Sequence, residues 1–241
     1  MYQGIPIKRL SIESIGHNKV LWATGIAMLI HSVGLMGMIW IDQYWFARMT
    51  PYNLLIMFSL IVWAQAEKKN SFYIFIAVSF IVGMASEMIG VKTGFLFGNY
   101  SYGRILGFRL AEVPLIIGLN WFVVIYSAVA TSHFFIEILS QRKMLKERSS
   151  NCSRISFSLV IGASFLATFF DWLMEPVAVR LGFWKWEGSG HIPLLNYLSW
   201  FFISTILLFI FRQLKIKPDN LFAVHLFFIQ LMFFILLRAF L

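Results

Sequence analysis

The sequence predicts an all-α integral membrane protein, a polytopic bundle of about seven transmembrane helices. Of its 241 residues, 59% are hydrophobic, 18% are aromatic and only 13% are charged, and the mean hydropathy is +0.76. A soluble domain carries about a quarter charged residues to cover its water-facing exterior. At about 20 residues a span, the length allows about seven helices and no separate soluble domain. Residues 1–241 are therefore predicted to form a single integral membrane domain.

The first two apolar stretches differ in length. The first lies near Asn18 to Trp40, after Lys8 and Arg9. Its apolar run is too long for a signal-peptide core and no small-residue cleavage site follows it, so we expect it to remain as a helix. The second, near Pro51 to Ala66, is short and begins with a proline, which suits the first position of a helix. We expect it to be a tilted or partly interfacial span.

Five longer apolar stretches complete the predicted bundle. Each is apolar over a window of about 19 residues, the usual criterion for a membrane span. They lie near Ser71 to Gly90, Val113 to Leu139, Ile155 to Leu181, Pro193 to Phe211 and Asn220 to Leu241.

The basic residues predict how this bundle is oriented. With seven spans, the amino terminus and the second, fourth and sixth loops share one side, which carries about 13 Lys and Arg residues against about 7 on the other. The fourth loop alone contributes Arg142, Lys143, Lys146 and Arg148. Short cytoplasmic loops are enriched in basic residues, so the amino terminus is predicted to be cytoplasmic, in a bacterial inner membrane. This placement also accounts for the formal charge of +9 without a nucleic-acid partner.

Several kinds of site are excluded by the residues that the sequence lacks. Cys152 is the single cysteine, so the chain can form neither an intramolecular disulfide nor a thiolate metal cage. The histidines are scattered, with no pair at the spacing of a zinc or di-iron site. Neither an aspartate-rich magnesium motif nor a nucleotide-binding loop is present. We therefore expect no metal and no cofactor.

Three acidic residues of the predicted helices are expected to be buried in the membrane. Glu87 lies near the outer end of the third helix, and Asp171 and Glu175 lie in the fifth. Residues four apart share one helical face, so Asp171 and Glu175 are expected to form a pair. Two like charges in a low dielectric cannot both ionise readily, and one of them is expected to hold its proton, as a general acid must. The alternative is a structural pair that fastens the helix to Asn120 or Asn196.

Amide and aromatic side chains are expected close to these acids. Asn120 and Trp121 lie in the fourth predicted helix, a few turns from its outer end. Asn196 and Trp200 lie in the outer turns of the sixth, at a similar depth.

Two loops on the same outer side combine glycines with aromatic residues. The third loop contains Tyr100 and Tyr102, and the fifth contains Trp184 and Trp186. Their glycines permit tight turns and close approach of backbones. Together the loops could roof a groove with aromatic walls. Anchoring of aromatic side chains at the membrane interface is the alternative explanation.

Five motifs carry a resemblance to a known family. They are EMIGVKTG at 87–94, FGNYSY at 97–102, DWLMEP at 171–176, GFWKW at 182–186 and IPLLNY at 192–197. In these motifs the chain resembles the CruF carotenoid hydratase family, which includes bisanhydrobacterioruberin hydratases and carotenoid 1,2-hydratases. The similarity extends from about the third to the sixth helix, and family members often have Asp where this chain has Glu175.

The resemblance implies that water is added across the terminal double bond of an acyclic carotenoid, giving a tertiary alcohol. It implies Asp171 or Glu175 as the acid and Glu87 as the group that orients water. The expected walls around the cation and substrate are Trp172, Trp184, Trp186, Tyr100, Tyr102, Asn120, Trp121, Asn196 and Trp200. The expected partners are the carotenoid, the lipid bilayer and other carotenoid enzymes.

Two alternatives begin from the same residues. A lycopene-cyclase-type enzyme starts with the same protonation but lets an internal alkene capture the cation. Asn120 and Asn196, which can hold water, favour the hydratase. A pigment-binding or lipid-transporting protein predicts acids that can be neutralised without loss of function, and inverted repeats would favour it.

Overall fold

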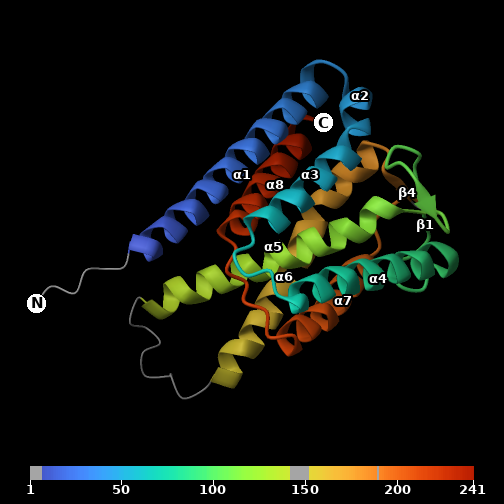
Figure 1. Ribbon diagram of the computed structural model, residues 1–241. Helices are drawn as coiled ribbons and strands as arrows, with labels where there is room; N and C mark the ends of the chain where they lie inside the picture. Colours follow the sequence, from blue (N-terminus) through green and yellow to red (C-terminus); the bar gives the residue numbers. More distant parts are fainter. Residues whose placement is uncertain (1–6, 142–151, 189) are drawn as a thin grey trace, which may run out of the picture.

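Helices make up most of the chain (Figure 1). The computed structural model describes residues 7–141, 152–188 and 190–241. The helices are α1 (Ile7–Trp40), α2 (Gln43–Arg48), α3 (Thr50–Ala64), α4 (Asn70–Thr93), α5 (Leu115–Gln141), α6 (Cys152–Arg180), α7 (Leu194–Gln213) and α8 (Leu221–Phe240). The strands are β1 (Tyr100–Tyr102), β2 (Arg109–Leu110), β3 (Val113–Pro114) and β4 (Trp184–Trp186).

Six of the described helices are long and apolar enough to cross a membrane, namely α1 and α4 to α8. The predicted all-α membrane bundle is therefore confirmed. The stretch expected near Pro51 to Ala66 forms α3, which has only 15 residues. At about 1.5 Å a residue it is about 22 Å long, less than the hydrocarbon core of about 30 Å. Met49 alone separates α3 from α2, a short helix that the sequence did not predict. Asp42 caps α2, because its side chain accepts a hydrogen bond from the backbone N–H of Trp45.

Contacts between loops show that successive helices from α3 to α8 run in alternating directions. Away from the strands, the connection between α3 and α4 meets the connection between α7 and α8. There Gln65 Oε1 accepts hydrogen bonds from Tyr126 Oη at 2.5 Å and from Asn220 Nδ2 at 3.1 Å, and Glu67 lies 3.9 Å from Lys217. The loops that carry the strands lie together at the other end of the bundle (Figure 1).

The orientation of the bundle in the membrane remains a prediction. Arg142, Lys143, Lys146 and Arg148, on which much of the charge asymmetry depends, lie outside the described residues.

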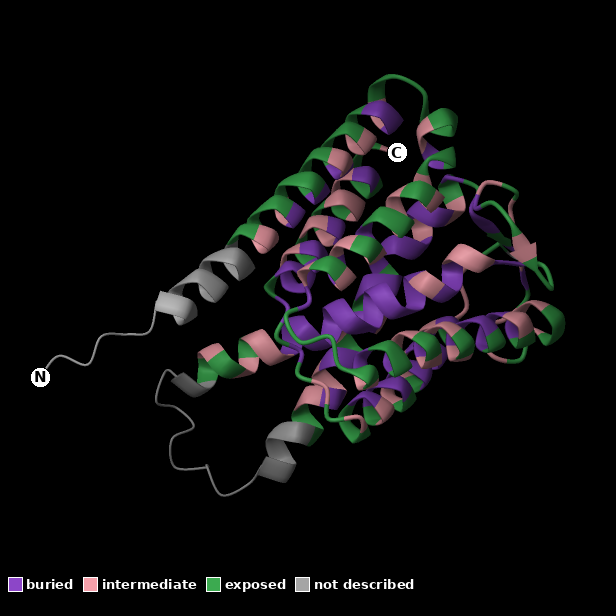
Figure 2. Cartoon of the chain, viewed as in Figure 1, coloured by how far each residue is buried: buried purple, intermediate pink, exposed green. Residues whose placement is uncertain are grey.

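Helix α5 forms the centre of the bundle. Its span is 83% buried inside the protein, whereas the span of α1 is 22% buried. Figure 2 shows α5 as a nearly continuous buried segment surrounded by helices with exposed outer faces. Because those outer faces carry large apolar side chains such as Leu21, Ile81 and Phe202, they suit contact with lipid. The core therefore sits between α5 and its neighbours, and α5 brings Asn120 and Trp121 into it.

The two outer loops join through a small antiparallel sheet. Tyr100 pairs with Trp186, Ser101 with Lys185 and Tyr102 with Trp184. Gly103 continues this contact, because its backbone N–H donates to Phe183 O at 2.7 Å. A Cβ atom at Gly103 would collide with the backbone of Gly182, so the close approach requires glycine there. The sheet was not predicted as such, but it joins the two loops that were expected to form a roof.

Candidate functional site

Beneath this sheet lies a pocket, here called the acid pocket, with an empty volume of about 400 Å³, counting the part that opens to the outside. Its walls come from α4, α5, α6, α7 and the two strands β1 and β4. The lining residues are Glu87, Phe97, Tyr100, Tyr102, Ile117, Asn120, Trp121, Asp171, Met174, Glu175, Trp184, Trp186, Asn196 and Trp200. All three acids anticipated from the sequence are therefore in one pocket, with the two asparagines and most of the aromatic residues expected around them.

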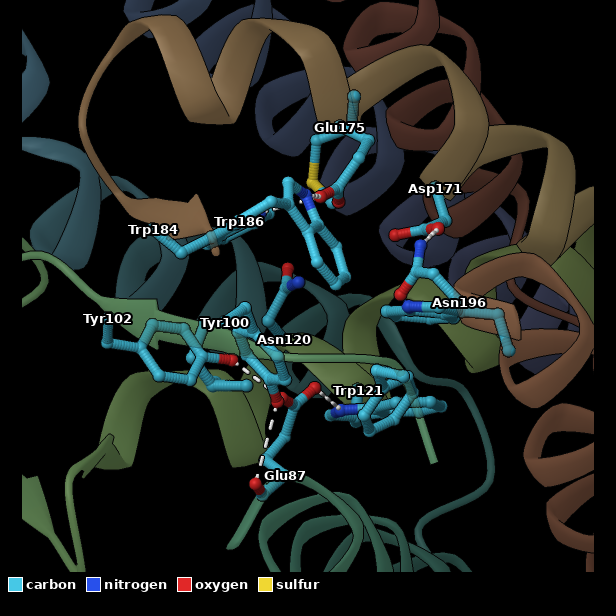
Figure 3. Close-up of a pocket in the computed structure, with 14 residues that line it drawn as sticks. Glu87, Tyr100, Tyr102, Asn120, Trp121, Asp171, Glu175, Trp184, Trp186 and Asn196 are labelled. Carbon is cyan, nitrogen blue, oxygen red and sulfur yellow. Dashed lines mark hydrogen bonds between the residues drawn. The ribbon is translucent and has the colours of Figure 1, made fainter. Parts of the chain in front are cut away.

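Glu87 receives the largest number of hydrogen bonds in the acid pocket. Its Oε2 accepts from Tyr100 Oη at 2.5 Å and from Tyr102 Oη at 2.7 Å. Its Oε1 accepts from Trp121 Nε1 at 3.0 Å. Figure 3 shows these three donors converging on one carboxyl group. Both oxygens accept hydrogen bonds, which holds the carboxyl group in position.

Glu175 is held in a similar way from the other strand. Its Oε1 accepts from Trp184 Nε1 at 2.7 Å and from Trp186 Nε1 at 2.6 Å. The side chain is only 2% exposed, so these indole N–H groups replace the water that a surface carboxylate would bind.

The register of the sheet explains why four aromatic donors point the same way. Alternate residues of a strand face the same side, so Tyr100 and Tyr102 on β1 share a face with Trp186 and Trp184 on β4. The residues between them, Ser101 and Lys185, do not line the pocket. One small sheet therefore presents two hydroxyl donors to Glu87 and two indole donors to Glu175.

Asp171 has fewer partners than the glutamates. Its Oδ2 accepts from Asn196 Nδ2 at 2.8 Å. Its Oδ1 is buried, and no described residue donates to it or accepts from it. The Asp171 side chain is 1% exposed. A buried polar oxygen without a partner is costly, so this position suits a group that carries a proton or meets a ligand.

The remaining walls are aromatic and amide side chains. The rings of Trp121 and Trp200 stack with centroids 3.9 Å apart. Asn120 lies between the Glu87 group and the Glu175 group (Figure 3). Its amide can donate and accept hydrogen bonds, so it can orient a small polar molecule such as water among the three acids.

Trp172 is the predicted site residue that does not line the acid pocket. Its side chain is 45% exposed, stacks on Phe169 and lies under the guanidinium of Arg238. One residue along a helix turns the side-chain direction by about 100°. Because Asp171 points into the pocket, Trp172 points out of the bundle, so its assignment to the pocket wall was wrong.

Phe97 belongs to the third loop, whose aromatic rings were expected to wall the groove. Two further lining residues, Ile117 and Met174, were not anticipated. They are ordinary apolar residues, and no sequence pattern separates them from the many other apolar side chains of the helices. Met174 lies one residue before Glu175, and Phe97 is the first residue of the FGNYSY motif, which also contains the two tyrosines.

The acid pocket holds no compensating cation, since no Lys, Arg or His of the described part of the chain lines it. Burial and the nearby carboxyl of Glu87 raise the pKa of Tyr102 far above its ordinary value, and burial does the same for the pKa of Tyr100. Both tyrosines are therefore neutral hydroxyl donors. Within the described ranges, no group of three or more His, Cys, Asp or Glu side chains is arranged to hold a metal ion.

Comparison with known proteins adds two similarities. A family model described as "Carotenoid biosynthesis protein" matches residues 49–241. A bisanhydrobacterioruberin hydratase from Haloarcula japonica is 28% identical over 128 residues, an alignment that covers 52% of this chain and 39% of the relative. The matched region is therefore well under half of that relative's length. No solved structure matches the chain.

Proposed function

Because this chain belongs to the carotenoid biosynthesis protein family, we propose that it is a membrane hydratase that adds water to the terminal double bond of an acyclic carotenoid. The name of the Haloarcula relative supports a hydratase activity. The observation that carries the proposal is the unequal hydrogen bonding of the three buried acids. Two of them are surrounded by donors, and the third keeps a free buried oxygen.

Asp171 is the proton donor in this proposal. A carboxylate accepts hydrogen bonds but cannot donate them, so the donors around Glu87 and Glu175 favour their ionised forms. Asp171 accepts a single hydrogen bond from Asn196, and an ionised group with one bare oxygen would be costly at 1% exposure. The protonated form removes this cost and leaves an acidic hydrogen to transfer to the substrate.

The carboxylates and rings stabilise the cation that follows. The proton of Asp171 forms a new C–H bond at the less substituted alkene carbon, which leaves a tertiary cation on the neighbouring carbon. Aromatic faces attract positive charge, and Trp186, Tyr100 and Trp200 line the same space. The negative charges of Glu87 and Glu175 act over a short distance in a low dielectric, which strengthens their effect.

Water then captures the cation. Asn120 lies between the two glutamates and is suited to hold that water (Figure 3). The new C–O bond forms as the water gives a proton to Glu87 or Glu175. This proton then passes through the pocket to Asp171 and replaces the proton that Asp171 donated. The sum is one water added to one double bond with no electron transferred, so the reaction itself requires no redox cofactor.

Labelled water tests the proposal directly. The purified chain is given lycopene in deuterated, oxygen-18 water, with and without air. A hydratase gives an alcohol with solvent deuterium on the carbon beside the carbinol and solvent oxygen in the hydroxyl, in both atmospheres. A cyclase would incorporate deuterium but no oxygen. Hydroxyl oxygen that came from dioxygen would refute the mechanism.

A further inference from the structure

A second, larger cavity adjoins the acid pocket. We call it the chamber; its empty volume is about 1630 Å³, counting the part that opens to the outside. Its walls come from α1, α2, α3, α5, α6 and α8 and from the loops at 106 and 183–184. Ile117, Asn120, Met174 and Trp184 line both the chamber and the acid pocket. These four residues form the threshold between the two spaces.

The wall of the chamber is apolar over most of its surface. Side chains such as Ile30, Met38, Phe170 and Phe234 line it, and its polar members are His31, Thr50, Asn53, Asn120 and Gln230. His31 is 5% exposed and its Nδ1 is bonded to Ala27 O within its own helix. Such a wall binds hydrocarbon, because charged or strongly hydrated groups would lose their water there.

The chamber opens between α1 and α3. Leu29 and Val33 on α1 line it and are 65% and 46% exposed, and Tyr52 and Ile56 on α3 line it and are 64% and 39% exposed. These side chains belong at once to the chamber wall and to the outer surface of the bundle. The surrounding face of α1 is apolar and spans the membrane, so the opening faces lipid hydrocarbon rather than water.

We infer that the long apolar part of the substrate enters from the bilayer between α1 and α3, lies in the chamber, and presents its end to the acid pocket across the threshold. This inference rests on the proposed function and extends it. It makes the substrate a linear hydrocarbon chain much longer than the part that reacts, taken from the membrane itself. It also gives a role to the space beside the threshold, which is larger than the acid pocket.

Two glycines on α1 supply a matched test. A Cβ atom at Gly34, in the chamber wall, would have Phe233 as its nearest neighbour at 3.8 Å, an ordinary contact. A Cβ atom at Gly25 would meet nothing within 4 Å, and Gly25 does not line the chamber. Both sites tolerate the first atom of a side chain, so Gly34→Phe fills the chamber and Gly25→Phe adds the same ring to the same helix outside it.

The measurement is binding of lycopene to the full chain in lipid nanodiscs, followed by quenching of tryptophan fluorescence, since Trp45 and Trp184 line the chamber. We expect Gly34→Phe to weaken binding by about tenfold or more, and Gly25→Phe to bind as the wild type does. Val33→Trp, at the exposed mouth of the chamber, is the second blocking variant and decides the question if Gly34→Phe does not fold. Unchanged binding in the folded blocking variant overturns the inference.

The test of the chamber inference can be separated from the test of the proposed hydratase function. Asp171→Asn removes the proposed acid but leaves the chamber intact, so it should bind lycopene with wild-type affinity and yield no alcohol. If the wild type binds lycopene, the blocking variant does not, and no variant hydrates it, the hydratase proposal fails and the chamber inference stands. If the blocking variant hydrates lycopene at the wild-type rate, the chamber inference fails and the hydratase proposal stands.

Discussion

Asp171, Glu87 and Glu175 have the same functional group but different surroundings. Glu87 accepts three hydrogen bonds and Glu175 accepts two, all from aromatic side chains, whereas Asp171 accepts one from an amide. Donors stabilise the charge of a carboxylate, and their scarcity favours the neutral acid. One pocket can therefore hold both a proton donor and two anions that stabilise a cation, which is the division of labour that acid-initiated hydration needs.

Replacing the proposed acid gives the first prediction at this scale. Asp171→Asn keeps the shape of the side chain and an oxygen for the Asn196 amide, but it has no acidic proton to give. Turnover should fall by about 100-fold or more, the usual contribution of a general acid, with membrane insertion unchanged. Product analysis by chromatography, together with the amount of folded protein, checks both parts.

The control is Glu187→Gln, because Glu187 is exposed and does not line the acid pocket, and it should remain close to the wild type. Glu175→Gln should also abolish product, since it removes an anion beside the cation. Normal turnover in both Asp171→Asn and Glu175→Gln would mean that the pair is structural.

Much of the site could be read from residue types alone. Charged and amide residues are rare in apolar helices, so Glu87, Asp171, Asn120 and Asn196 stand out in the sequence. What could not be read is which donor serves which acid, because that depends on side-chain directions across the pocket. Trp172 failed for this reason: it adjoins Asp171 in sequence but faces the other side of the helix.

At the scale of elements, the sheet of β1 and β4 is one part of the fold that sequence reasoning left out. Each strand has three residues, too few for a periodic pattern to reveal. Their register depends on a partner more than 80 residues away in the chain. The aromatic and glycine content of the loops indicated a roof, but the pairing that aims the donors is a tertiary property.

Gly103→Ala tests the importance of this sheet. The added methyl group would collide with the Gly182 backbone and force the two loops apart. The stability of the protein should fall by about 1–3 kcal/mol, the usual cost of overpacking, and turnover should fall because Tyr102 is drawn away from Glu87. Thermal unfolding followed by tryptophan fluorescence, with turnover measured in parallel, checks the prediction.

Ser101→Ala is the matched local control. It lies on β1, two residues before Gly103, but does not line the acid pocket, so it should leave stability and turnover unchanged. Gly103→Ala with wild-type values for both would show that the sheet does not position the donors.

At the scale of the whole molecule, the hydrophobic patterning predicted the fold class and the positions of the long helices. The short second stretch forms α3, and the structure adds the unpredicted helix α2 before it, on the other side of Met49. The packing of α5 at the centre could not be predicted, because the six candidate spans of the described residues have similar mean hydropathies, between 1.6 and 2.1, and hydropathy does not show which one is enclosed.

The direction in which the bundle crosses the membrane is the prediction that belongs to this scale. The excess of basic residues in alternate loops places the connection between α5 and α6 in the cytoplasm and the loops of β1 and β4 on the outer side. Reporter fusions after Lys146 should therefore behave as cytoplasmic, and fusions after Gly188 as extracytoplasmic. The reverse pattern would place the acid pocket near the inner surface.

The sequence distances within the acid pocket have a consequence for how the protein is made. Every donor to a buried acid lies downstream of it: 13, 15 and 34 residues after Glu87, 9 and 11 after Glu175, and 25 after Asp171. A growing chain emerges from its amino terminus, so each acid leaves the ribosome before its donors do. The delay is short, because the donors to each acid lie in the loop that follows its helix or in the next long helix of the chain. By the time Asn196 has been added, the ribosome has supplied all of these donors, and the polar centre can assemble before α8 exists.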